Sequence, residues 1–337
     1  MFRKNCRVVK NIKATLNHFV LTLRSSRISG NAKPGQFVQL LCSETGDPLL
    51  PRPFSFLKAG KNDFSLLYHV VGKGTEILSK KKTGDFLWTL GPLGNGFGYT
   101  SSSNALVEDH PDGPRQKISG ATDIILIGGG VGIPPLYHLA ETIIRHSEEA
   151  RGRRRISKSE ILRRSLRRPP QDDNVCSRIH VFLGARNQAL LLCEKDFKKL
   201  GVKLEIATND GSKGHKGFVT DLLEDFLASF PNVRHKASAD PSAFQWRTLV
   251  GDRPDDSRQK IAGMTHIYTC GPTPMLKVVS MIAQKYEVPC EVSVEVPMAC
   301  GFGACLGCAI KIKTEHSHRF AIACTEGPVF QGKDIVW

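Results

Sequence analysis

Apolar and polar residues alternate over short stretches of the first hundred residues, and turns rich in glycine and proline separate these stretches. The pattern is clearest at residues 19–23, 36–41 and 64–71. Strands of this length, spaced by turns, predict an antiparallel β-sandwich or β-barrel.

The pattern changes after residue 121. Residues 123–127, Asp-Ile-Ile-Leu-Ile, form a continuous apolar run that predicts a strand buried on both faces. Strand and helix then alternate, which predicts a parallel α/β sheet. The further elements predicted are strands at 179–184, 204–207 and 266–270, and helices at 136–144, 218–230 and 274–286.

A chain of 337 residues has room for two or three domains, so the fold class predicted is multidomain. The alternating, polar and strand–helix regions follow one another without overlap. The division predicted is an antiparallel β-barrel over 1–100, a polar connector over 101–121, an α/β parallel-sheet domain over 122–289 and a small C-terminal domain over 290–337.

Two insertions interrupt the predicted α/β domain, a basic one near 145–178 and a polar one near 235–262. The chain carries a net charge of +15, and eleven Lys or Arg residues lie among five acids between Arg145 and Arg178. Such a run can bind nucleic acid, but it lacks the interleaved aromatic side chains that stack on bases. A solvated loop insertion without nucleic-acid binding is therefore favoured.

Composition argues against a membrane or secreted protein. No apolar run approaches the length of a membrane span, and the basic N-terminus lacks the apolar core of a secretion signal. We therefore expect a cytoplasmic protein. Six of the ten cysteines show no paired spacing and are interpreted as reduced thiols, namely Cys6, Cys42, Cys176, Cys193, Cys270 and Cys290.

The other four cysteines carry the most specific signal in the chain. Cys300, Cys305 and Cys308 have the spacing C-x4-C-x2-C, and fifteen residues separate Cys308 from Cys324. This is the ligand spacing of a plant-ferredoxin-type 2Fe–2S cluster, and the interspersed glycines let backbone N–H groups face sulfur. Zinc is an alternative, although its sites usually come as two C-x2-C pairs; unligated thiols are another.

Three short segments of the predicted barrel favour a flavin nucleotide. Residues 52–55, Arg-Pro-Phe-Ser, supply a cation for a pyrophosphate and a hydroxyl for the isoalloxazine edge. Residues 68–70 add an aromatic side chain that would flank a ring system. Residues 72–75, Gly-Lys-Gly-Thr, would begin a helix with N–H groups facing phosphate. Each segment alone also fits an ordinary surface turn.

Two loops of the predicted α/β domain favour a nicotinamide nucleotide. Residues 128–135, Gly-Gly-Gly-Val-Gly-Ile-Pro-Pro, lie between a buried strand and a helix, where a phosphate would meet the helix N-terminus. They do not form the G-x-G-x-x-G fingerprint. Residues 270–275, Cys-Gly-Pro-Thr-Pro-Met, end a later strand at the same sheet edge. Alone, Cys270 would be an ordinary buried thiol; beside the first loop it becomes a candidate for nicotinamide contact.

In this order, the motifs resemble the ferredoxin-reductase-type electron-transfer flavoproteins. Residues 295–301, Glu-Val-Pro-Met-Ala-Cys-Gly, and 324–330, Cys-Thr-Glu-Gly-Pro-Val-Phe, are similar to the electron-transfer subunits of NAD-linked (class 1B) dihydroorotate dehydrogenases. The resemblance covers the chain apart from its polar and basic insertions. It departs from the family at His69, where another polar or basic residue is frequent, and at Pro297, where Arg is common.

The resemblance implies that the barrel binds FAD, the α/β domain binds NAD and the C-terminal domain holds a 2Fe–2S cluster. It implies FAD contacts at Arg52, Pro53, Phe54, Ser55, Tyr68, His69, Val70, Gly72, Lys73, Gly74 and Thr75. It implies NAD contacts at Gly128, Gly129, Gly130, Gly132, Pro134, Gly271, Pro272 and Met275, with Cys270 as the catalytic residue. The cluster ligands would be Cys300, Cys305, Cys308 and Cys324.

The resemblance also implies a partner, an FMN-containing dihydroorotate dehydrogenase catalytic subunit, in a heterotetramer of two of each chain. Nicotinamide exchanges two electrons as hydride and a cluster accepts one, so a flavin between them is the converter that the chemistry requires. The expected function is electron transfer between that partner and NAD in pyrimidine (UMP) biosynthesis. The alternative is an NAD(P)H reductase subunit of a hydrogenase-like or ferredoxin-linked complex.

The choice between NAD and NADP is ambiguous in the sequence. Arg186 would meet a 2′-phosphate, whereas Glu194 would bind a ribose hydroxyl. The family resemblance favours NAD.

Overall fold

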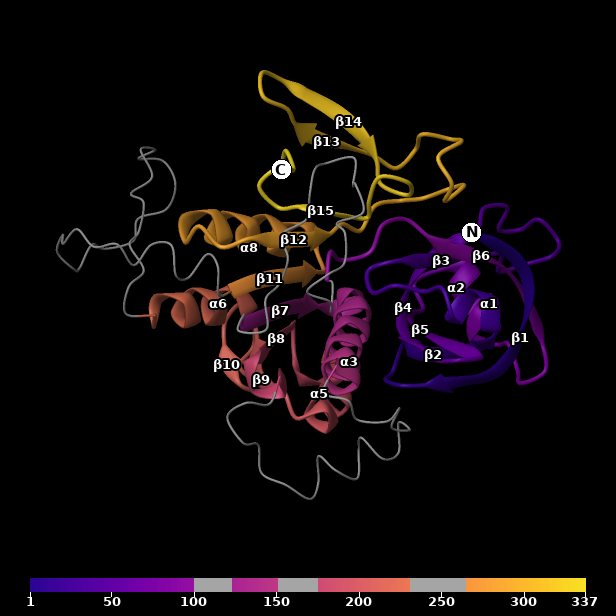
Figure 1. Ribbon diagram of the computed structural model, residues 1–337. Coiled ribbons are helices and arrows are strands. Elements are labelled where there is room, and N and C mark those ends of the chain that lie inside the picture. Colours follow the sequence, from indigo (N-terminus) through magenta and orange to yellow (C-terminus); the bar gives the residue numbers. More distant parts are fainter. Residues whose placement is uncertain (100–122, 151–174, 231–264) are drawn as a thin grey trace.

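The computed structural model describes residues 1–99, 123–150, 175–230 and 265–337 (Figure 1). The predicted connector, most of the basic insertion and all of the polar insertion lie outside the described residues. None of the helices within these ranges is both long enough and apolar enough to cross a membrane.

The N-terminal strands form a closed antiparallel barrel in the order β1-β2-β5-β4-β3-β6, as the alternating pattern predicts. Its core contains the inward-facing side chains of Leu21, Val38, Phe56 and Leu66, among others. The strands are β1 (Phe2–Lys13), β2 (His18–Arg24), β3 (Phe37–Leu40), β4 (Arg52–Ala59), β5 (Asp63–His69) and β6 (Phe86–Leu93), with helices α1 (Ser26–Ser29) and α2 (Lys73–Ser79).

The second unit is a seven-stranded sheet in the order β10-β9-β8-β7-β11-β12-β15. All neighbours are parallel except β15, which runs antiparallel to β12. The strands are β7 (Asp123–Gly129), β8 (Ile179–Ala185), β9 (Lys203–Thr208), β10 (His215–Lys216), β11 (Thr265–Cys270), β12 (Cys290–Ser293) and β15 (Val329–Gln331). The helices and helical turns are η1 (Gly130–Gly132), α3 (Ile133–Ala150), η2 (Val175–Arg178), η3 (Gln188–Leu190), α5 (Glu194–Leu200), α6 (Val219–Ala228) and α8 (Thr273–Lys285).

The central strand β7 is apolar because both faces of the sheet are covered. Ile124 and Leu126 pack in one core cluster with α3 residues, whereas Ile125 and Ile127 pack in another with residues of α6 and α8. Successive side chains of a strand point to opposite faces, so a strand between two helical layers needs a continuous apolar run.

The sheet continues past residue 289, where the predicted division put its end. Both β12 and β15 belong to the C-terminal region, yet they form one edge of this sheet. Between them the chain forms the cysteine-containing loop and a separate hairpin of β13 (Ala309–Lys313) and β14 (His318–Ile322), seen at the top of Figure 1.

The barrel contacts the α/β sheet mainly through α3, which lies between them in Figure 1. Strand β4 packs along α3, and the Lys58 ammonium lies 3.2 Å from the Asp196 carboxylate of α5. The barrel also contacts the C-terminal region. The Asn95 side chain donates to the carbonyls of Thr325 (3.2 Å) and Glu326 (2.8 Å).

Two loops meet at the carboxyl edge of the sheet. A methyl group added at Gly132 would lie 2.4 Å from the Cys270 carbonyl carbon and the Gly271 nitrogen. Glycine is therefore required there by the close approach of two backbones.

We expect Gly132→Ala to destabilise the protein by about 3 kcal/mol, because the colliding atoms are backbone atoms of a central strand. Gly130→Ala is the matched control. Gly130 has a φ of +56° but nothing within 4 Å of an added methyl, so we expect only the left-handed penalty of about 1 kcal/mol. Thermal unfolding of the two variants measures the difference, and equal melting temperatures would contradict the close approach.

Candidate functional site

The predicted pyrophosphate site brings together two segments that are separate in sequence. Arg52 is the first residue of β4, and its Nε would lie 3.5 Å from a methyl group added at Gly74 in α2. Its Nη1 donates to the carbonyls of Leu50 (2.8 Å) and Pro51 (3.3 Å), which hold the guanidinium beside this helix. A cation and helical N–H groups therefore converge, as a pyrophosphate requires.

The other residues of 72–75 shape this turn. The Thr75 hydroxyl accepts hydrogen bonds from the N–H groups of Val71 (2.9 Å) and Gly72 (3.2 Å). The Lys73 ammonium pairs with the Asp47 carboxylate at the surface. Thr75 thus fixes the start of α2, and Lys73 ties it to the loop before β4.

Tyr68, whose ring is predicted to flank a flavin, lies in the core of the barrel in this structure. Tyr68 is 2% exposed, packs with Phe19 and Phe54, and donates its hydroxyl to Asn11 Oδ1 (3.2 Å). Its side chain faces the barrel interior, and the next residue, His69, faces outward because strand side chains alternate. His69 stacks on His18 of β2 with ring centroids 4.4 Å apart.

The two nicotinamide loops lie against each other. Cys270 pairs with Gly128 in the β7–β11 register. A methyl added at Gly129 would lie 3.1 Å from Met275 Sδ and 3.3 Å from Pro272 Cδ. The helix α3 begins directly after these glycines, with Pro134 buried in its first turn. Sequence reasoning thus placed both loops at one edge correctly.

Cys270 is a neutral thiol in this environment. It is 2% exposed, it pairs with Ser293 of the adjacent β12 in the strand register, and burial raises its pKa well above the usual value. Glu295 is exposed, and desolvation by the surrounding protein raises its pKa in the same direction. Burial thus disfavours the thiolate form of Cys270, which suits contact with the nicotinamide ring more than proton abstraction.

The flavin-motif strands and the first nicotinamide loop are in contact. Strand β4 packs against α3, and β5 contacts η1. The strands proposed to hold the flavin thus lie next to the segment proposed to hold the nicotinamide, and hydride transfer requires such proximity.

Backbone hydrogen bonds to sulfur link the four cysteines of the C-terminal region in two pairs, three of them from the loop before β13 and Cys324 from the segment after β14. The Cys305 N–H donates to Cys300 Sγ (3.5 Å), and the Cys324 N–H donates to Cys308 Sγ (3.4 Å). The Gly303 N–H joins the pairs by donating to Cys324 Sγ (3.2 Å). Cys308 and Cys324 are buried, whereas Cys305 is exposed.

The pairs respond differently to their surroundings. Desolvation opposes ionisation of Cys300, but N–H groups of Cys305, Phe302 and Ala304 outweigh it and lower its pKa to about 6. Desolvation, then the Cys308 thiol, raises the pKa of Cys324 to about 12. Backbone donors around the loop therefore already favour thiolate at one end.

This arrangement suits two irons better than a single ion. Two thiol pairs linked by a glycine N–H match a cluster in which each iron takes two cysteines.

Asp210 is a candidate that sequence reasoning missed. Glu194, the predicted ribose ligand, instead pairs with Lys198 (2.8 Å) and Lys213 (2.7 Å). Asp210 follows β9 at the carboxyl edge, where its N–H donates to the Arg186 carbonyl (3.3 Å). The side chain and then the backbone N–H of Ser212 lower the pKa of this exposed carboxyl, so it is charged at neutral pH. An acidic residue directly after a strand of the parallel sheet is the sequence signal that could have identified Asp210 as a ribose ligand.

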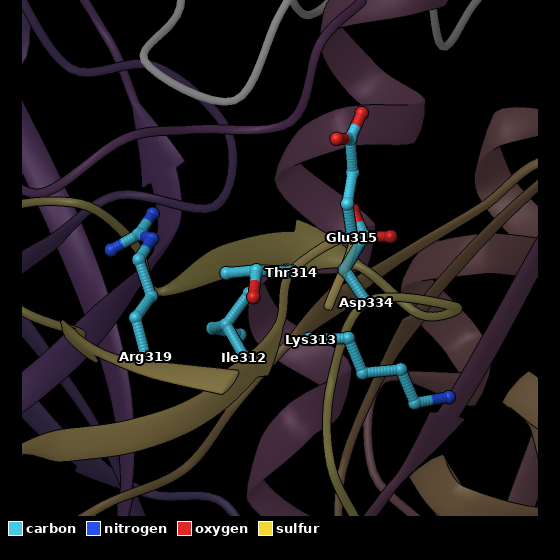
Figure 2. Close-up of a pocket in the computed structure, with 6 residues that line it drawn as sticks. All are labelled: Ile312, Lys313, Thr314, Glu315, Arg319 and Asp334. Carbon is cyan, nitrogen blue, oxygen red and sulfur yellow. The ribbon is translucent and has the colours of Figure 1, made fainter. Parts of the chain in front are cut away.

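A hollow of about 350 Å³ lies at the end of the β13–β14 hairpin (Figure 2). Its charged residues are Lys313, Glu315, Arg319 and Asp334. The Lys313, Glu315 and Arg319 side chains point in different directions in Figure 2, and Arg319 pairs with Glu326 at 2.5 Å. The hollow therefore offers no convergent ligand set.

The barrel, the facing nicotinamide loops and the cysteine loop together define an NAD-linked flavin oxidoreductase with an iron–sulfur domain. Comparison with known families agrees. A profile described as the oxidoreductase NAD-binding domain matches residues 126–281, and one described as the iron–sulfur cluster binding domain of dihydroorotate dehydrogenase B matches residues 295–336.

Similar proteins narrow the class. The dihydroorotate dehydrogenase B (NAD(+)) electron transfer subunit of Desulforamulus reducens is 33% identical over 95% of this chain and 93% of its own length. That of Shouchella clausii is 28% identical over 98% and 96%. The chain belongs to the family of dihydroorotate dehydrogenase B electron transfer subunits.

Solved structures support the fold. An NADH-dependent reduced ferredoxin-NADP oxidoreductase matches with a TM-score of 0.64 and 26% identity, covering 98% of this chain and 90% of that one. A Neisseria gonorrhoeae ferredoxin NADP+ reductase with bound FAD and NADP matches with a TM-score of 0.51 and 15% identity, over 84% and 91%. The second likeness concerns the fold alone.

We expect Asp210→Ser to raise the ratio of kcat/KM for NADPH to that for NADH by about tenfold, because the variant removes a charge that repels a 2′-phosphate. Asp225→Ser, toward the far end of α6, is the control for net charge. Steady-state dye reduction with each nucleotide measures the ratio. An unchanged ratio for Asp210→Ser would remove this residue from nucleotide selection.

Proposed function

We propose that this chain is the cytoplasmic electron-transfer subunit of an NAD-linked dihydroorotate dehydrogenase, acting in pyrimidine biosynthesis. Its partner would be the FMN-containing catalytic subunit, in a heterotetramer of two of each chain. The observation that carries the proposal is the position of the barrel. It contacts η1 of the first nicotinamide loop through β5, α3 through β4, and the cysteine segment through Asn95.

We assign one cofactor to each of the three regions of the chain. The barrel (1–100) binds FAD, the α/β region (122–289) binds NAD, and the C-terminal region (290–337) carries the 2Fe–2S cluster, with β12 and β15 shared with the sheet. When bound, FAD supplies the exchange between a two-electron hydride carrier and a one-electron cluster.

The chain's own residues hold and orient these groups. Arg52 and the start of α2 hold the pyrophosphate of FAD, and the glycines 128–130 and 132 admit the nicotinamide nucleotide close to the backbone. Cys270, held neutral by burial, contacts the nicotinamide without removing a proton from it. Backbone N–H groups of the cysteine loop donate to thiolate sulfur and so stabilise the ligated form.

The cysteine loop is also the proposed docking site of the catalytic partner. Phe302 is 50% exposed and Leu306 is 60% exposed, and both flank the exposed Cys305. Neighbouring exposed apolar side chains mark interaction surfaces. A partner that covers this loop would place its own carrier next to the cluster.

A second candidate is an NADH-dependent reductase subunit of a ferredoxin-linked complex. The 26% identity to the NADH-dependent reduced ferredoxin-NADP oxidoreductase over 98% of this chain favours it. The two candidates use the same carriers and differ in the protein that receives the electrons.

The deciding experiment is activity with and without a partner. The isolated chain is expected to reduce a dye with NADH but not to oxidise dihydroorotate. In the proposed complex, the dihydroorotate site belongs to the catalytic partner. Adding a dihydroorotate dehydrogenase catalytic subunit should restore dihydroorotate-dependent NAD⁺ reduction. Reduction of ferredoxin in place of that activity would support the second candidate, and dihydroorotate oxidation by the isolated chain would contradict the first.

Cys305→Ala should abolish the iron–sulfur signal while leaving FAD bound, because the proposed flavin contacts lie in the barrel. The native chain should contain about two irons and two sulfides. The matched control is Cys42→Ala, which changes a buried barrel thiol and should leave the iron and sulfide content intact. Iron, sulfide and flavin analysis measures all three. Stoichiometric zinc without acid-labile sulfide in the native chain would overturn the cluster assignment.

A further inference from the structure

Gln39 is a buried amide whose polar atoms lack partners. Its side chain is 1% exposed, and neither Nε2 nor Oε1 makes a hydrogen bond. Buried polar side chains in folded proteins are nearly always hydrogen-bonded, so an exception calls for an explanation such as a bound group. Gln39 lies on β3 of the barrel, outside every motif described above.

The direction of Gln39 follows from its neighbours on β3. Val38 and Leu40 belong to the barrel core. Phe37 belongs instead to the core cluster that contains Cys308 and Cys324. Because strand side chains alternate, Gln39 lies on the same outer face as Phe37, toward the C-terminal region.

Gln39 touches the cysteine loop directly. A methyl added at Gly301 would lie 2.5 Å from Gln39 Cγ and 2.9 Å from its Nε2. Gly301 follows the proposed ligand Cys300, and its φ of +81° is one that glycine adopts readily. The amide is therefore placed at the ligand loop rather than at the hairpin.

Gln39 also borders the flavin motif. It pairs with Pro53 of β4 in the β3–β4 register, and Pro53 is the second residue of the 52–55 motif. Gln39 thus lies between the proposed flavin strand and the proposed cluster loop. Its unpartnered amide could hydrogen-bond a group bound at either site.

We propose that Gln39 is a positioning residue that donates an N–H hydrogen bond to the sulfur atoms of the cluster on its Cys300 side. The inference rests on the proposed function. A hydrogen bond to cluster sulfur stabilises the reduced, more negative state more than the oxidised one, and so raises the reduction potential. The barrel would in this way favour arrival of an electron at the cluster edge nearest the flavin strand.

The test is Gln39→Met in the holoprotein, because methionine has a similar length and flexibility but no N–H donor. In an EPR-monitored redox titration, we expect the equilibrium constant for reducing the cluster to fall about fivefold. For one electron this lowers the reduction potential by ~40 mV, since a tenfold change corresponds to 59 mV. The flavin potential should stay unchanged. Gln36→Met is the control, since Gln36 donates to the Gly94 carbonyl (2.7 Å).

A second measurement detects the proposed hydrogen bond directly in the native chain. With ¹⁵N in glutamine side chains, pulsed EPR of the reduced native chain should show a coupling between one ¹⁵N and the cluster. The coupling should persist in Gln36→Met and vanish in Gln39→Met. Absence of the coupling in the native chain, or an unchanged potential in a fully loaded Gln39→Met protein, would overturn the role of Gln39. Absence of iron and sulfide from the native chain would instead overturn the proposed function.

Discussion

The junction between the barrel and the C-terminal region is the contact on which the rest of the structure depends. A methyl added at Gly94 would lie 2.6 Å from the Gly327 carbonyl oxygen, and the Asn95 side chain bonds the two preceding carbonyls. Cys324 lies three residues before Gly327. The barrel therefore holds the segment directly after one proposed cluster ligand, while β5 of the same barrel contacts η1 of the first nicotinamide loop and β4 contacts α3.

The α/β region was largely predictable because its signals are local. A continuous apolar run gives β7, and the predicted helices at 218–230 and 274–286 match α6 and α8 within a residue or two. The loops 128–135 and 270–275 were placed together because parallel strands end at one edge. The flanking strands β12 and β15 were missed as sheet members, since their pairing joins segments more than thirty residues apart.

The site shows the same limit at the level of side chains. Tyr68 lies in a strand, as the alternating pattern predicts, but its side chain faces the barrel core because the barrel closes around its ring. Gln39 has the sequence signature of an ordinary polar strand residue, and only the C-terminal segment that covers it makes it buried. The cysteine spacing predicted the ligand set, but the division into two pairs depends on backbone donors whose direction no spacing encodes.

Because β12 pairs antiparallel with β15, the segment between them leaves the sheet and returns to it at adjacent strands. Its two ends are neighbours in one ladder, Ser293 opposite Val329, so they are fixed about 4.8 Å apart across adjacent strands. A segment clamped at both ends cannot swing as a tethered domain does. The spacing between the proposed FAD, NAD and cluster sites is thus set by the rigid sheet and barrel. Insertions within the β13–β14 hairpin would lengthen the segment between β12 and β15 without altering that spacing.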